Sequence, residues 1–289
     1  MSVRQPVIFC ELSQTTNDLI EQYVEALRAS APSIGSHGMD EREFWQSGLF
    51  RAAIERLRGT QVATMREKHD FIRRIMDFLA KQNKITGWEF HGSGERHDYE
   101  VHINNYTCVI EAKGCLDGNN TTIFQRPPNA DEFIIWSLCQ NPGADPRHNA
   151  WSGIHTRLSA EIIHRKERVD GLIIWDMLCG TKGRICPKLT AQAERVTTID
   201  ALQVPPPCLY LFPRTIPDAR NNPRPACWNI DDVKFLSILY DAFRCDAQDV
   251  VEISIEVRMS GPNVERRTLW KRGDTLVAVS PWTKIKRAR

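Results

Sequence analysis

Three ionisable residues stand out in the stretch HDYEVHINNYTCVIEAKG, residues 97–114, because Asp98 begins an alternating run that Glu111 and Lys113 close. Alternation with a period of two is typical of β-strands. The Asn104-Asn105 pair suits a two-residue type I′ turn, since Asn tolerates positive φ. We therefore predict a hairpin in which Asp98 lies opposite Glu111, with Lys113 on the same face.

Two carboxylates on opposite strands repel each other unless a cation compensates their charge. Mg²⁺ prefers oxygen ligands and is usually held by one or two carboxylates, waters and phosphate, and Mn²⁺ can substitute for it. We expect Asp98 and Glu111 to bind this ion, while Lys113 orients a water or stabilises charge on a phosphate. This is the chemistry of phosphodiester hydrolysis. The alternative is a ladder of surface ion pairs, which contribute little to stability.

The other face of the predicted hairpin is apolar throughout, and its residues are Tyr99, Val101, Ile103, Tyr106, Cys108, Ile110 and Ala112. We expect this face to pack on a core helix over 62–79 or over 151–164. His97 and His102 flank the polar face. We expect each to hydrogen-bond a neighbour rather than to bind a metal.

Periodicity also predicts the elements around the hairpin. The segments 11–60 and 62–79 have helical spacing, ITGWEFHGSG is a strand candidate, a further helix spans about 149–168, and VDGLIIWDML is a buried strand. We read 115–149 as loop-like with one apolar run, EFIIWSLC. The predicted order of helix, three strands, helix and strand describes an α/β core with a mixed sheet.

The remainder of the chain predicts additional elements. The proline-rich segment 204–227 is expected to lack regular structure. A helix follows over 230–245, then a hairpin turning at Gly261-Pro262-Asn263 and a last strand, TLVAVSPW. We predict a mixed β-sheet flanked by helices (α+β), with a helical segment at 1–60, a core at 61–180 and a C-terminal α+β extension at 181–289 packed as one unit with the core.

The hairpin resembles the signature of the PD-(D/E)xK nuclease superfamily, because twelve residues separate His97-Asp98 from Glu111-Ala112-Lys113. His97 stands where that signature often has proline. The resemblance covers about residues 61–178 and implies a restriction-endonuclease-like core that cleaves DNA, with Asp98 and Glu111 as metal ligands and Lys113 as the catalytic lysine. A second match at Asp232–Lys234 falls in a predicted helix and is read as surface.

The chain has 289 residues and carries no helicase, ATPase or methyltransferase motif, and no Q-x-x-x-Y follows the lysine. It therefore resembles a type II restriction endonuclease, which implies double-stranded DNA as substrate, a homodimer and a cognate DNA methyltransferase as functional partner. Two alternatives stay open: a repair or structure-specific nuclease of the same fold, and a non-catalytic nucleic-acid-binding protein.

The net charge is only +2, so DNA binding requires a local concentration of basic residues. Arg and Asn are suited to guanine and adenine respectively. The candidate DNA-binding residues are Arg126, Arg147, His148, Asn149, Arg220, Arg224, Lys284 and Lys286. We expect at least one of Arg126, Arg147 and Asn149 to read a base, and the C-terminal lysines to contact phosphates.

No stretch is apolar enough for a signal-peptide core or a membrane span, and the nine cysteines include no CxxC pair. We therefore expect a cytoplasmic protein with reduced cysteines. Cys179 and Cys186 do not have a standard zinc spacing, and a metal site that combines them with a distant His is left open.

Overall fold

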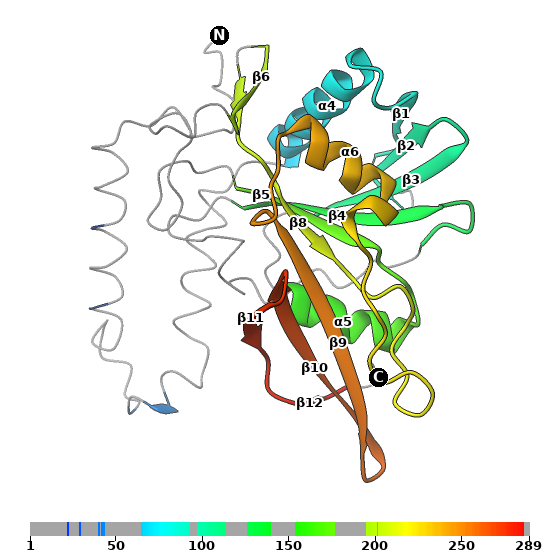
Figure 1. Cartoon of the computed structure of the whole chain (residues 1–289), viewed down its shortest axis with the longest axis vertical. Helices are drawn as coiled ribbons and strands as arrows, with labels where there is room; N and C mark the ends of the chain where they lie inside the picture. The colour runs from blue at the N-terminus through cyan, green and yellow to red at the C-terminus, as the bar shows by residue number, and fades with distance from the viewer. Residues whose placement is uncertain are drawn as a thin grey trace.

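A computed structural model of the chain (Figure 1) describes residues 65–92, 97–113, 126–139, 154–176, 195–200 and 202–285, together with five isolated positions before residue 44. The helical segment predicted at 11–60 and both predicted domain boundaries, at 60 and 180, lie outside these ranges.

The described residues build a ten-stranded sheet in the order β1-β2-β3-β4-β5-β8-β9-β10-β11, with β12 paired to β10. Its strands are β1 Gly87–Phe90, β2 Tyr99–Ile103, β3 Tyr106–Lys113, β4 Glu132–Cys139, β5 Gly171–Asp176, β8 Cys208–Leu211, β9 Val250–Ser260, β10 Asn263–Arg272, β11 Thr275–Val279 and β12 Thr283–Lys284. A separate two-stranded sheet pairs β6 Thr197–Ile199 with β7 Leu202–Val204.

The sheet is mixed, as predicted for an α+β protein. The first three strands form an antiparallel meander, and β3, β4 and β5 run parallel to one another. After β5 the sheet continues through an antiparallel pairing with β8 and a parallel pairing of β8 with β9. Strands from the predicted core and from the predicted C-terminal extension therefore belong to one sheet.

Helices cover both faces of the sheet (Figure 1). Helix α4, Met65–Lys81, and helix α6, Lys234–Ala242, pack on one face, where their apolar residues join the inward side chains of β2 to β5. Helix α5, Ile154–Arg165, packs on the other face through Leu158 and Ile162. The long β9–β10 hairpin packs on α5 near its base, and its turn extends beyond the helices at the bottom of Figure 1. It turns at Gly261-Pro262, since Ser260 pairs with Asn263, as predicted.

The register predicted for the β2–β3 hairpin is confirmed. Tyr99 pairs with Ile110, Val101 with Cys108, and Ile103 with Tyr106. The apolar face of the hairpin lies against α4, which was one of the two helices predicted for this contact. The turn itself differs from the prediction: Asn104 has a φ of 57°, but Asn105 does not have positive φ, whereas a type I′ turn requires it at both.

Two central strands of the large sheet were not predicted, and neither were the short strands β6, β7 and β12. The run EFIIWSLC is β4, a central strand between β3 and β5, so an extra strand precedes α5 in the expected element order. The segment CLYL inside the proline-rich region is β8, which is also central and fully buried. A strand covered on both faces shows a continuous apolar run rather than alternation, and so its sequence does not have the period of a half-buried strand.

Gly171 begins β5 at a place where the sheet and α6 approach closely. A Cβ atom there would lie 3.1 Å from the carbonyl oxygen of Tyr210 and 3.2 Å from Cδ1 of Ile134, and would overlap the side chain of Leu236 on α6. By contrast, nothing lies within 4 Å of a Cβ atom built at Gly87 in β1. The absence of a side chain at Gly171 is therefore a packing requirement.

We predict that Gly171→Ala lowers the free energy of unfolding by about 1–3 kcal/mol, because α6 must shift to admit the methyl group. Gly87→Ala is the matched control in the same sheet and should change stability by no more than about 0.5 kcal/mol. Urea unfolding of both variants measures the difference. Equal stabilities would contradict the close approach of α6 to β5.

Candidate active site

The three residues predicted for catalysis come from two neighbouring strands of the sheet. Asp98 lies directly before β2, and its backbone N–H donates to the carbonyl of Ile110 on β3 at 3.2 Å. Its carboxylate Oδ2 accepts a hydrogen bond of 2.8 Å from the backbone N–H of Ala112. The Asp98 carboxylate is therefore held against β3 between Glu111 and Lys113, next to Glu111, the residue predicted to lie opposite Asp98.

Glu111 is a buried carboxyl group with 5% of its surface exposed. Lys113 Nζ contacts its Oε1 at 2.5 Å, and the lysine side chain is itself only 13% exposed. Burial raises the pKa of Glu111, and the charge of nearby Asp98 raises it further, whereas the hydrogen bond and charge of Lys113 act in the opposite direction. The site thus holds two acidic groups and one ammonium group with little water around Glu111.

The site lies at the carboxyl end of β3, where the sheet is parallel. Ser137 on β4 is the register partner of Lys113 and is buried at 5% exposure, so its hydroxyl group shares the face of Glu111 and Lys113. Carboxyl ends of parallel strands commonly carry the ligand sites of open α/β sheets. Ser137 was missed in the sequence because the strand that carries it was missed.

Asp98 and Glu111 fit a divalent cation with oxygen ligands. Mg²⁺ is usually bound by one or two carboxylates, with waters and substrate phosphate completing its shell. Burial, with a smaller contribution from the charge of Asp98, raises the pKa of Glu111, and a bound cation would favour the ionised carboxylate against both effects. His97 and His102, expected to be hydrogen-bonding neighbours, each have Nε2 near the Glu100 carboxylate, at 3.7 and 4.0 Å.

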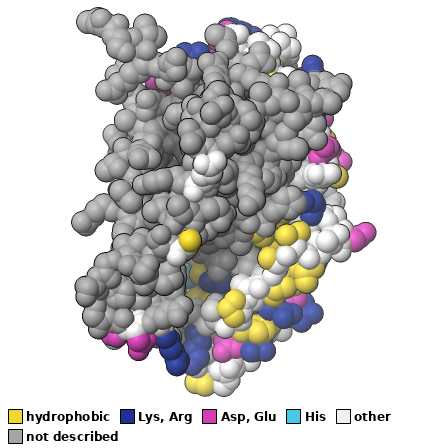
Figure 2. All heavy atoms as spheres, turned by 90° about the vertical axis from the view of Figure 1, so that its left-hand side faces the viewer, with side chains coloured by type: hydrophobic (Ala, Val, Ile, Leu, Met, Phe, Trp, Pro, Cys, Tyr) yellow, Lys and Arg dark blue, Asp and Glu magenta, His cyan; other side chains and the backbone are white. Residues whose placement is uncertain are grey.

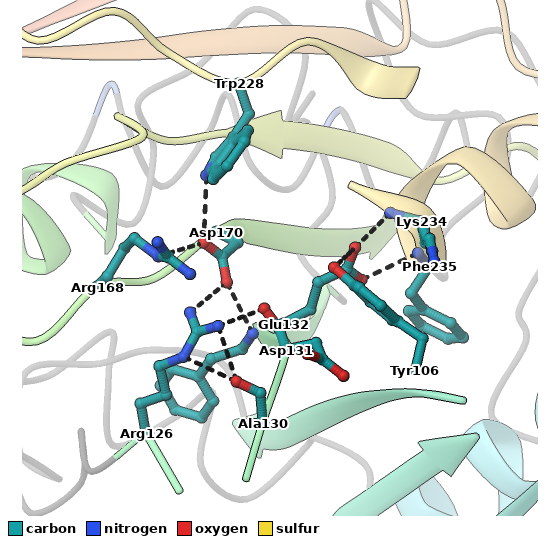
Figure 3. A network of polar contacts seen from close by, with 11 residues as sticks. Tyr106, Arg126, Ala130, Asp131, Glu132, Arg168, Asp170, Trp228, Lys234 and Phe235 are labelled. Carbon is teal, nitrogen blue, oxygen red and sulfur yellow. Dashed lines mark hydrogen bonds and ion pairs between the residues drawn. The ribbon is translucent and has the colours of Figure 1, made fainter. Parts of the chain in front are cut away.

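Two buried carboxylates hold the opposite, amino ends of the parallel strands (Figure 3). Glu132 begins β4 and accepts hydrogen bonds from Tyr106 Oη at 2.8 Å and from the backbone N–H groups of Lys234 and Phe235. These are the first two residues of α6. The Glu132 carboxylate therefore caps α6 from a distant strand, since the N-cap residue Val233 makes no side-chain capping bond.

Asp170, which precedes β5, is the second of these carboxylates and is 2% exposed. Its Oδ2 accepts from the backbone N–H of Phe133 at 2.9 Å and from Arg126 Nη1 at 2.6 Å. Its Oδ1 accepts from Trp228 Nε1 at 3.1 Å and forms an ion pair of 2.8 Å with Arg168 (Figure 3). The carboxylate is thus fully bonded in a buried position.

Arg126, one of the predicted DNA contacts, has its guanidinium group directed into the protein. Besides Asp170, it donates to the carbonyl oxygen of Ala130 at 2.9 Å and to that of Asp131. Its side chain is 15% exposed. This geometry favours a structural role for Arg126 over the predicted base contact.

The other predicted DNA contacts are exposed or lie outside the described residues. Arg220, Arg224 and Lys284 are exposed, and Arg224 forms an ion pair with Glu256 at 3.2 Å. Arg147, His148, Asn149 and Lys286 are outside the described ranges. On the face shown in Figure 2, the described Lys and Arg side chains are interspersed with acidic and hydrophobic ones.

The second sequence match, Asp232–Lys234, lies where the 3₁₀-helix η5, Ile230–Asp232, meets α6. The Asp232 carboxylate pairs with Arg214 and accepts from the backbone N–H of Asn229 at 3.3 Å. Asp232 is therefore an exposed residue that stabilises the start of the 3₁₀-helix, and it does not face a partner carboxylate on a strand.

A scan against protein-family models, a search of the curated proteins and a search of the solved structures each find no match to this chain. In the part of the chain that the structure describes, no helix is long and apolar enough to cross a membrane. Cys179 and Cys186 lie outside that part, and Cys108, Cys208, Cys227 and Cys245 form no disulfide.

The raised pKa of Glu111 predicts a specific pH dependence of stability in the metal-free protein. An acid whose pKa is higher in the folded than in the unfolded chain contributes stability below its ordinary pKa of 4.5, and this contribution is lost as the pH rises through the folded value. Glu111→Gln cannot ionise, so the wild type should lose stability relative to this variant between about pH 4.5 and neutral pH.

Urea unfolding of the wild type and Glu111→Gln, in chelator and across that pH range, measures the difference in their stability. The other carboxyl groups are the same in both proteins, so their contributions cancel in this difference. Adding Mg²⁺ at neutral pH should then stabilise the wild type more than the variant. A difference that does not change with pH would mean that Glu111 ionises as freely in the folded chain as in the unfolded one.

The contacts of Arg126 predict that Arg126→Met destabilises the fold by about 2–4 kcal/mol, because it leaves the buried Asp170 with one cation fewer. Arg220→Ala removes an exposed guanidinium and is the control, with an expected change below about 0.5 kcal/mol. Denaturant unfolding tests both. An Arg126→Met protein of unchanged stability and weakened DNA discrimination would instead support the base contact predicted from sequence.

Proposed function

We propose that the protein is a metal-dependent endonuclease of the PD-(D/E)xK type that hydrolyses phosphodiester bonds of double-stranded DNA. The observation that carries this proposal is the convergence of Asp98, Glu111 and Lys113, with the Asp98 carboxylate bonded to the backbone of β3 between the other two residues and Lys113 in contact with Glu111. An ion-pair ladder on a surface hairpin would leave these groups solvated, whereas Glu111 and Lys113 are largely buried.

The arrangement of elements supports a restriction-endonuclease-like core. An antiparallel meander of three strands leads into parallel strands, α4 packs behind the meander, and the charged residues lie where the second and third strands meet. The additional central strand β4 and the C-terminal strands extend this arrangement into the ten-stranded sheet.

Each residue has a distinct task in the proposed reaction. Asp98 and Glu111 would hold Mg²⁺, which supplies positive charge to a phosphate oxygen and acidifies a bound water. Asp98 is oriented by the Ala112 N–H, so its second oxygen stays available for the ion. Lys113 opposes the effect of burial on the pKa of Glu111 and so favours its ionised form, and it would present an ammonium group to the phosphate, where developing negative charge needs stabilisation.

Among nucleases of this type, we favour a type II restriction endonuclease, acting as a homodimer on a palindromic site and accompanied by a cognate methyltransferase. The support is the resemblance of its motif, and the dimer follows from the two-fold symmetry of such sites. A repair nuclease would use the same three residues without reading a sequence.

We predict that Asp98→Ala, Glu111→Ala and Lys113→Ala each reduce cleavage at least about a hundredfold while leaving the protein folded, because the first two remove a metal ligand and the third removes the ammonium group that stabilises charge on the phosphate. Asp274→Asn, an exposed carboxyl group in the β10–β11 turn, is the control and should cleave normally. Circular dichroism of each variant checks the fold. Full activity of Glu111→Ala, or undiminished cleavage in excess chelator, would refute the site.

A plasmid digest with Mg²⁺ distinguishes the classes of function in one experiment. Discrete fragments indicate a sequence-specific restriction enzyme, smearing or branch-specific cutting indicates a repair nuclease, and a retarded but uncut plasmid indicates a binding protein. Replacing Mg²⁺ by Ca²⁺ should preserve binding and abolish cleavage, since Ca²⁺ accepts the same oxygen ligands in a looser geometry.

A further inference from the structure

A second group of potential metal ligands lies beside Asp98 and is not used by the proposed reaction. His91 follows β1, His97 precedes β2, and Glu100 is the second residue of β2. The backbone N–H of His91 donates to the carbonyl of Asp98 at 3.0 Å, which continues the β1–β2 pairing and brings His91 alongside the start of β2.

The two imidazole rings converge on one carboxylate oxygen. Nε2 of His91 and Nε2 of His97 each lie 3.7 Å from Glu100 Oε2, and the ring centroids are 4.8 Å apart. One ligand atom from each of the three residues lies within 4.8 Å of the others. The side chains are partly buried, with exposed fractions of 29%, 13% and 18% for His91, His97 and Glu100.

These separations are longer than a hydrogen bond and close to the spacing of atoms around a shared ion. At zinc–ligand distances of about 2.0–2.2 Å, two ligand atoms of a tetrahedral site lie roughly 3.3–3.6 Å apart. If an ion lay about 2.1 Å from both His91 Nε2 and Glu100 Oε2, which are 3.7 Å apart, the angle between these two ligand atoms at the ion would be roughly 120°. The three side chains therefore surround a position that a small cation can occupy after a minor adjustment.

We propose that His91, His97 and Glu100 bind one divalent transition-metal ion, with Zn²⁺ as the best fit. Two imidazoles and one carboxylate form a ligand set of nitrogen and oxygen that suits Zn²⁺, whereas Mg²⁺ prefers oxygen ligands alone. Three protein ligands leave a fourth position for water or for an anionic oxygen of a bound molecule.

This site is distinct from the pair Asp98 and Glu111 and does not depend on the proposed nuclease function. The two sets of ligands are close in sequence, because Asp98 of the first set lies between His97 and Glu100 of the second. An ion held by His91, His97 and Glu100 would join the end of β1 to the start of β2 and so restrain the backbone that carries Asp98.

Zinc binding to the full-length protein, stripped with chelator and kept reduced, tests the proposal without DNA. Competition against a chromophoric chelator, in the presence of excess Mg²⁺, should show that His91→Ala, His97→Ala and Glu100→Gln each weaken one Zn²⁺ site at least about a hundredfold. His164→Ala, which removes a histidine from α5, and Glu111→Ala should both bind as the wild type does. Since nine cysteines provide other zinc ligands, the relevant quantity is the difference between each variant and the wild type.

Thermal unfolding provides a second readout that also controls for folding. Zn²⁺ should raise the melting temperature of the wild type and of His164→Ala, but not that of His91→Ala. His91 is the most exposed of the three ligands, so its replacement is the least disruptive. Unchanged zinc affinity in His91→Ala and His97→Ala would overturn the proposal, and so would a loss of zinc in Glu111→Ala alone, which would place the ion at the other site.

Discussion

Two buried carboxylates, Glu132 and Asp170, hold the parallel part of the sheet together. Each lies at the amino end of a parallel strand, and each is 2% exposed. A carboxylate in such a position is costly unless hydrogen bonds and cations compensate it. Glu132 is compensated by the N-terminus of α6 and by Tyr106, and Asp170 by two arginines, an indole and a backbone N–H. Strands, helix and connecting segments must all be in place for both groups to be satisfied.

This arrangement leaves the carboxyl ends of the parallel strands β3, β4 and β5 available for function. The amino ends of β4 and β5 are joined to α6 and to the segments that carry Arg126 and Arg168. The carboxyl end of β3 instead carries Glu111 and Lys113, whose charges partly compensate each other. Burial raises the pKa of Glu111 despite the contact with Lys113, so the lysine compensates this carboxylate only in part. Incomplete compensation in a buried site is typical of a place that binds an ion or a substrate.

Residues 97–100 connect the two proposed metal sites. The Asp98 carboxylate is bonded to the backbone of β3 between Glu111 and Lys113, while Glu100 and His97 both lie beside His91 on the adjacent segment. If both proposals hold, one ion would restrain the backbone at Asp98 and a second would use its carboxylate. The oxygen-only pair and the histidine-containing group would then select different metals from the same solution.

The sequence by itself determined the local geometry of the hairpin. Period-two alternation and a two-residue turn specify which residues pair, because a slip of one residue would turn every apolar side chain to the wrong face. The pairing of Tyr99 with Ile110 and the position of Lys113 beyond Glu111 were therefore predictable. Other local signals identified β1 as a short aromatic run closed by glycines, β5 as a short apolar run, and the β9–β10 hairpin by its turn.

Only the tertiary structure decided which segments lie together over long distances in the chain. β4 and β8 were not recognised because their short apolar runs lie in segments rich in proline, asparagine or glycine, which indicate loops. The capping of α6 by Glu132 joins residues about a hundred positions apart, and the ion pair between Arg126 and Asp170 joins residues 44 positions apart. The convergence of His91 on Glu100 likewise depends on strand pairing rather than on a local motif. Such contacts follow from the packing of distant elements, which the spacing of residues along the sequence does not reveal. They determine whether a charged residue stabilises the fold or is free to act on a ligand.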